Sequence, residues 1–316
     1  MSPASPVSSL SPLDRSSAFV SHDARFGAVL RDEPRLVRVV ETDAHEGPVY
    51  VPSEDTLLFT SLPRRTGGDP LVAVRRLALD GRRFPLEPER ISTVREDANV
   101  ANGMALDAQG RLVLCEQGTR STPAQVTREG RPIAAARPDG LPLNSPNDVV
   151  VRRDGSVWFT DPGYGWLQGF RPEPAGGDHV YRYDPAAEGL TAVATSFDKP
   201  NGLCFSPDEL TLYVADNGAP HHLKAFDVVR GERLANERVI AEFPPEHPDG
   251  LEADADGRLY ASTGDGVRVL SAEGEPLGEI VVPGAVNFCF GTAERNVLFI
   301  TTDDAIWAAE LAAKGA

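Results

Sequence analysis

Cysteine is scarce in this chain of 316 residues, which holds only Cys115, Cys204 and Cys289. They are far apart and each lies inside an apolar run, so there is neither a CxxC metal motif nor an even disulfide framework, and we expect buried free thiols. No apolar run approaches the roughly 18 residues that a membrane span needs, and the amino terminus lacks the regions of a signal peptide. These absences predict a cytoplasmic protein with a flexible segment at 1–20 and one domain at 21–316.

Positive charge is also in short supply. The 31 Lys and Arg residues face 47 Asp and Glu residues, which gives a net charge of -16. A protein of this charge is a poor ligand for nucleic acid or for an anionic membrane, so we expect neither as a partner. Helical patterns are nearly absent as well: the tail "AIWAAELAAKGA" at 305–316 is the best candidate for a helix, with a final strand as the alternative.

What the chain does contain is a repeated unit. The stretch "NSPNDVVVRRDGSVWFTDPG" at 144–163 has a small polar start, a short apolar run, a tight turn and a second β-rich run. The same pattern begins near Glu46, Asn102, Asn201, Asp249 and Asn287. The starts are about 40 to 55 residues apart, which is typical of propeller blades. With two further strands between copies, the repeat predicts an all-β, six-bladed β-propeller; a double β-sandwich would share the alternation but not the regular repeat.

The polar residues that start the copies are expected to meet. If the first strand of every blade is the innermost one, these residues crowd at one mouth of the central channel. They offer carboxylate and amide oxygens, the ligands of hard cations such as Ca²⁺ and Mg²⁺, so the repeat predicts a central metal site with calcium as first choice. The alternative is that each Asn or Asp only caps a local loop. Glu46 favours the metal site, because Glu is a poor turn-former.

Several motifs, taken in order, carry a resemblance to a known family. "HEGPVY", "SPNDVVV", "DKPNGLCFSPD" and "HPDGLEADADGRLY" resemble the successive motifs of the gluconolactonase, senescence marker protein and luciferin-regenerating enzyme family, with the bacterial gluconolactonases nearest. The resemblance implies a metal-dependent six-bladed propeller that acts on lactones and related esters. It implies metal ligands at Glu46, Asn201 and Asp249, a substrate-contacting amide at Asn147, and acid/base work for Asp249. Where the senescence-marker branch has a sugar-binding Arg, this chain has Ser145.

These observations predict a metal-dependent hydrolase that opens a sugar lactone, with Ca²⁺ as the expected cofactor and Zn²⁺, Mn²⁺ or Mg²⁺ as alternatives. The cation would polarise the carbonyl and activate water, Asp249 would accept the proton, and Asn147 and Asn102 would donate hydrogen bonds. Two other functions stay open. One is a non-catalytic binding propeller with a structural cation, and the other is a related hydrolase of aryl esters or phosphotriesters.

Residues beside this ring are given mainly structural roles. Asp148 is expected to brace its loop rather than to face the substrate. The segment at 163–179 is long enough to be a lid, or is a surface excursion. Three further residues follow the second β-rich run of their repeats: Asp161, Tyr164 and Asp216. Each either joins blades or lines the pocket, and we favour the structural role.

Overall fold

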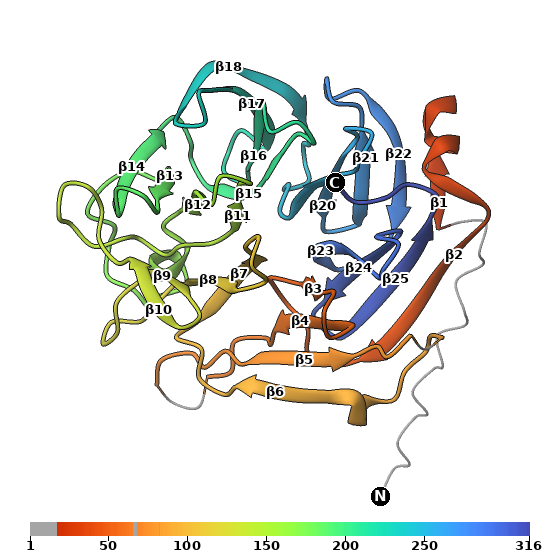
Figure 1. Cartoon of the computed structure of the whole chain (residues 1–316), viewed down its shortest axis with the longest axis horizontal. Coiled ribbons are helices and arrows are strands. Elements are labelled where there is room, and N and C mark those ends of the chain that lie inside the picture. The colour runs from red at the N-terminus through yellow and green to blue at the C-terminus, as the bar shows by residue number, and fades with distance from the viewer. Residues whose placement is uncertain (1–17, 66–67, 82) are drawn as a thin grey trace, which may run out of the picture.

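The described residues fold into six antiparallel sheets arranged in a ring (Figure 1). Four sheets consist of four consecutive strands, and the other two each include a strand from the start of the chain. The computed structural model describes residues 18–65, 68–81 and 83–316. The first three blades are β3 (Val49–Val51), β4 (Thr56–Thr60), β5 (Val74–Ala78) and β6 (Ile91–Arg95); β7 (Ala101–Leu106), β8 (Leu112–Glu116), β9 (Gln125–Arg128) and β10 (Arg131–Ala134); and β11 (Val149–Val151), β12 (Val157–Asp161), β13 (His179–Asp184) and β14 (Gly189–Ala194).

The remaining three blades complete the ring and confirm the predicted six-bladed propeller. The fourth is β15 (Pro200–Phe205), β16 (Thr211–Asp216), β17 (His222–Val229) and β18 (Arg233–Glu242). The fifth is β19 (Leu251–Ala253), β20 (Leu259–Thr263), β21 (Gly266–Leu270) and β22 (Pro276–Val281), extended by β1 (Phe19–Ser21). The sixth is β23 (Ala285–Gly291), β24 (Val297–Thr302), β25 (Ala305–Leu311) and β2 (Leu30–Glu41).

Strand β2 closes the ring by joining the two ends of the chain. It pairs antiparallel with β25, with Leu36 opposite Ala309, and in Figure 1 the two lie side by side. Because β2 comes from the start of the chain and β25 from its end, their pairing fixes the first described blade to the last one. The carboxyl-terminal tail is therefore a strand, and the helical interpretation of it was wrong. The predicted flexible segment at 1–20 lies outside the described residues up to residue 17, whereas Phe19 and Val20 belong to β1.

Helices contribute little to the described residues. They are the 3₁₀ turns η1 (Ala24–Ala28) and η2 (Pro88–Arg90) and the single-turn α1 (Tyr164–Leu167). Within the described part of the chain, no helix combines the length and apolar character that crossing a bilayer requires.

Among the described residues, the hydrophobic core is divided into six clusters, one between each pair of neighbouring blades. Between the third and fourth blades, for example, the fully buried Trp158 packs edge-on against Phe205 with ring centroids 5.5 Å apart. Because every blade is buried on both faces, its strands read as apolar runs rather than as a strict alternation. The three cysteines are free and buried, as predicted.

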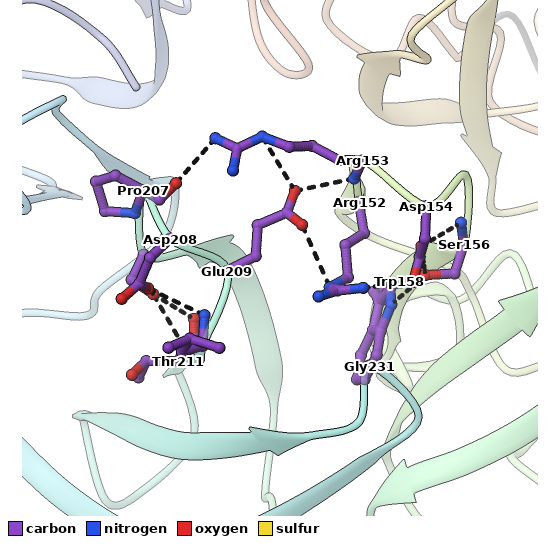
Figure 2. Close-up of polar contacts among 12 residues, drawn as sticks. Arg152, Arg153, Asp154, Ser156, Trp158, Pro207, Asp208, Glu209, Thr211 and Gly231 are labelled. Carbon is purple, nitrogen blue, oxygen red and sulfur yellow. Dashed lines mark hydrogen bonds and ion pairs between the residues drawn. The ribbon is translucent and has the colours of Figure 1, made fainter.

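The third and fourth blades are also joined by charged groups on their connecting turns (Figure 2). The Arg153 amide N–H donates to Glu209 Oε1 at 2.9 Å, and the Arg152 guanidinium lies 3.4 Å from Glu209 Oε2. The Glu209 side chain is only 13% exposed, so water screens these contacts less than it screens an ordinary surface pair.

We expect Glu209→Gln to lower the free energy of unfolding by about 1 kcal/mol, because the amide keeps one hydrogen bond and loses the ion pair. Urea titration would measure the change. Glu173→Gln is the matched control, since Glu173 is exposed and has no ion pair among the described residues. An equal effect of the two substitutions would contradict the bridging role.

Candidate active site

The innermost strands of the six blades contact one another in sequence around the channel: β3, β7, β11, β15, β19 and β23. The predicted polar residues stand at or near the starts of these strands, and hydrogen bonds link three neighbouring pairs of blades at these positions. Gly103 N donates to Asn147 O at 2.7 Å, and Gly202 N donates to Asp249 O at 3.0 Å. Asn287 Nδ2 closes the circle by donating to Glu46 Oε2 at 2.8 Å. The structure thus brings residues 241 positions apart into direct contact.

Glycine after the polar residue is what permits this close approach. A Cβ on Gly103 would lie 2.6 Å from Asn147 O, and one on Gly202 would lie 2.2 Å from Asp249 O. Both glycines lie inside strands and neither has a positive φ, so the Asn-Gly pairs are not turns. The local-capping alternative therefore does not describe Asn102 or Asn201.

Hydroxyl side chains at the end of the second strand hold the polar residues in place. The Glu46 N–H donates to Thr60 Oγ1 at 3.1 Å, and the Thr60 hydroxyl donates back to Glu46 O at 3.0 Å. Thr301 accepts in the same way from Asn287 N, whereas Thr160 and Ser262 accept from the N–H of the residue that follows Asn147 or Asp249. These residues were missed in the sequence, although a Ser or Thr recurs there in "LLFT", "WFT", "YAS" and "FIT".

Asp249 lies beside other negative charge. Its Oδ1 is buried and has no hydrogen-bond partner among the described residues. Burial, then the charges of Glu46 and Asp148, raise the pKa of Asp249 well above its usual value, while a hydrogen bond from Asn201 opposes the rise. Unpaired carboxylates crowded together at a buried position are unfavourable unless a cation joins them.

The amide side chains complete the set. Asn201 is 5% exposed and its Nδ2 donates to the phenolic oxygen of Tyr164 at 3.2 Å. Asn147 is buried at the entry to β11, with no hydrogen bond to its side chain in the described part of the protein. Asn102 has a buried Oδ1 that likewise lacks a partner there. All five predicted site residues therefore stand in the ring.

The donor set fits a hard divalent cation. Within residues 18–65, 68–81 and 83–316, no three His, Cys, Asp or Glu side chains form a metal cluster. A cation at this mouth would be held by the two carboxylates of Glu46 and Asp249 together with an amide oxygen of Asn201. Oxygen ligands of this kind suit Ca²⁺ or Mg²⁺ better than Zn²⁺.

Neighbouring carboxylates have structural roles. Asp148 accepts from Val149 N at 2.9 Å and from Leu203 N of the next blade at 3.3 Å, which is the bracing role expected of it. Asp161 is fully buried and accepts from Asn144 N and Ser145 N at 2.9 and 2.8 Å. Burial raises the pKa values of Asp148 and Asp161 to about 7. Asp216 makes equivalent contacts to the loop at 198–199.

Tyr164 differs from these carboxylates, because its side chain contacts a residue of the polar ring. Besides its contact with Asn201, burial and the nearby charges of Asp249 and Glu46 raise the pKa of the Tyr164 phenol far above its usual value. The phenol therefore keeps its proton and acts as a neutral hydrogen-bonding group. The hydrogen bonds of Asp161 and Asp216 fit the structural role favoured from the sequence, whereas the contact of Tyr164 with Asn201 fits the alternative of pocket lining.

Comparisons with known proteins agree with this fold. The family model described as "SMP-30/Gluconolactonase/LRE-like region" matches residues 44–304. A gluconolactonase of Zymomonas mobilis is 30% identical over 87% of this chain and 83% of its own length. The lactonohydrolase oryL of Aspergillus oryzae is 27% identical over 92% of this chain and 73% of its own. The solved structure of a Xanthomonas campestris gluconolactonase superposes with a TM-score of 0.79 and 35% identity, covering 93% of this chain and 95% of that one.

Proposed function

Because this chain belongs to the SMP-30/gluconolactonase/LRE-like family, we propose that it is a metal-dependent lactonase that opens a sugar lactone to the hydroxy acid. The observation that carries the proposal is the pair of Glu46 and Asp249, two neighbouring carboxylates with no cationic side chain between them among the described residues. A propeller that only docked a partner would have no use for such a costly arrangement.

The chemistry divides between the cation and the side chains. Held by Glu46, Asn201 and Asp249, a divalent cation would supply Lewis-acid polarisation of the lactone carbonyl and a lower pKa for the attacking water. Asp249 takes the proton that water loses as its oxygen bonds to the carbonyl carbon. When the bond to the ring oxygen breaks, the same proton passes to that oxygen, which becomes the product hydroxyl. Asn147 and Asn102 stand in the ring where they can position the substrate oxygens.

Hydrolysis of glucono-1,5-lactone, followed with a pH indicator against the spontaneous rate, tests this function. We expect chelated protein to lose activity and one of Ca²⁺, Mn²⁺, Mg²⁺ or Zn²⁺ to restore it. Phenyl acetate and a phosphotriester should be assayed in parallel. Turnover of these alone would support the alternative hydrolase, and binding of metal without any turnover would support the binding propeller.

A further inference from the structure

Tyr164 presents a free hydrogen-bond donor at the mouth of the channel. It is the first residue of α1, directly after the second strand of the third blade. Its phenolic oxygen accepts from Asn201 Nδ2 at 3.2 Å, and its hydroxyl hydrogen has no acceptor among the described residues. The Asp249 carboxylate acts on both Asn201 and the phenol, so the phenol lies near the carboxylate at which the ester reacts.

Ser145 holds the turn that carries Tyr164. The Ser145 side chain is fully buried, and its Oγ donates to Pro162 O at 2.5 Å and accepts from Gly165 N at 3.0 Å. The Ser145 hydroxyl therefore hydrogen-bonds the backbone on both sides of Tyr164, and its only hydrogen is not free to bind a substrate. Ser145 therefore serves to place the phenol.

Arg171 fixes the same turn from the other side. It is 6% exposed, and its guanidinium donates to the carbonyls of Thr119, Thr122, Leu143 and Asn144. The N–H groups of Phe170 and Arg171 both donate to Gly165 O, at 3.0 and 2.9 Å. A Cβ on Gly165 would lie 2.2 Å from Arg171 Cγ, so the two residues are packed in contact. This half of the 163–179 segment is therefore anchored and does not have the freedom of a lid.

We propose that Tyr164 is a substrate-binding residue whose O–H donates to a hydroxyl group of a polyhydroxylated lactone, and that Ser145 is its positioning residue. The inference rests on the proposed function and deepens it. The ester group must lie at Asp249, so the phenol, which contacts Asn201 instead, faces the ring substituents rather than the reacting bond. A rigidly supported donor suits this role, because little conformational freedom is lost when substrate binds.

Tyr164→Phe, compared on two substrates, tests the proposal. For glucono-1,5-lactone we expect KM to rise about five- to tenfold, the effect of one neutral hydrogen bond, with kcat within about twofold. For δ-valerolactone, which has no ring hydroxyls, we expect no change in KM. If this lactone is not hydrolysed and acts only as a competitive inhibitor, its Ki should stay unchanged. The Mn²⁺ affinity by calorimetry and the melting temperature should also stay unchanged. Tyr183→Phe, in a buried tyrosine of the same blade, is the matched control.

Three results would overturn the proposal: unchanged kinetics on gluconolactone, an equal loss on both lactones, or a loss that follows weaker Mn²⁺ binding. Ser145→Ala should raise the same KM, and combining it with Tyr164→Phe should add nothing further, since both act through one contact. Additive losses would refute the positioning role. Wild-type protein that hydrolyses no lactone would instead refute the proposed function, so the two failures are distinguishable.

Discussion

Asp249→Asn will reduce kcat/KM for glucono-1,5-lactone by about a thousandfold at a saturating concentration of the activating metal, which is the usual scale for loss of a general base. Without metal, the same variant will melt at a higher temperature than the wild type. The amide removes a charge that burial and the neighbouring Glu46 and Asp148 make unfavourable, so the substitution relieves repulsion in the empty site.

The combination of lost activity and gained stability is what distinguishes a catalytic carboxylate from a structural one. Kinetics, metal titration by calorimetry and thermal melting of chelated protein would measure the three quantities. Asp32→Asn is the control, because Asp32 is exposed and its carboxylate has no partner among the described residues. Activity within tenfold of the wild type, or a melting temperature below it, would refute the role given to Asp249.

The propeller and its polar ring were predictable because one physical requirement is repeated in every blade. Each innermost strand must pass close to its neighbour, so "NG" and "DG" recur at 102, 201 and 249. The polar side chain that precedes each of these glycines lies at the mouth of the channel. The same dipeptides can also form turns, and only the structure shows that Gly103 and Gly202 lie within strands.

Closure of the ring could not be predicted from the repeat. Strand β2 precedes the first copy and has no pattern of its own: Leu30–Glu41 is mostly exposed or half-buried. Its place beside β25 depends on the finished ring, a long-range pairing that local sequence does not encode.

The contact of Tyr164 with Asn201 could not be predicted for a related reason. Its neighbours along the chain, Pro162 and Gly163, indicate a loop, and a tyrosine in a loop has no preferred direction. Its direction is set by Ser145, which lies 19 residues earlier (164 − 145), and by Arg171, whose guanidinium is held by carbonyl groups of the preceding blade. A site residue held by such contacts becomes visible only once the blades are assembled.

Glu252→Gln will stabilise the protein at high pH, by up to about 3 kcal/mol. Glu252 lies on β19 and lines a cavity of about 560 Å³ among the innermost strands, where its Oε2 accepts from Phe290 N at 3.2 Å. Burial raises the pKa of this carboxyl from 4.5 to about 7. The folded protein therefore binds a proton that the unfolded chain has already released between these two values. Stability from this group is complete below about pH 4.5 and is lost as the pH rises through about 7.

The difference in the free energy of unfolding between wild type and Glu252→Gln reports on this carboxyl alone. Asp148 and Asp161, whose raised pKa values act in the same direction, contribute equally to both proteins. Urea titrations of chelated protein at pH 5 and pH 8.5 should show nearly equal stabilities at the lower pH and a more stable variant at the higher one. Glu33→Gln, in an exposed residue of β2, should show no such dependence on pH. A constant difference across the range would mean that Glu252 is already ionised in the folded protein at pH 5, with the cavity wet enough to solvate it.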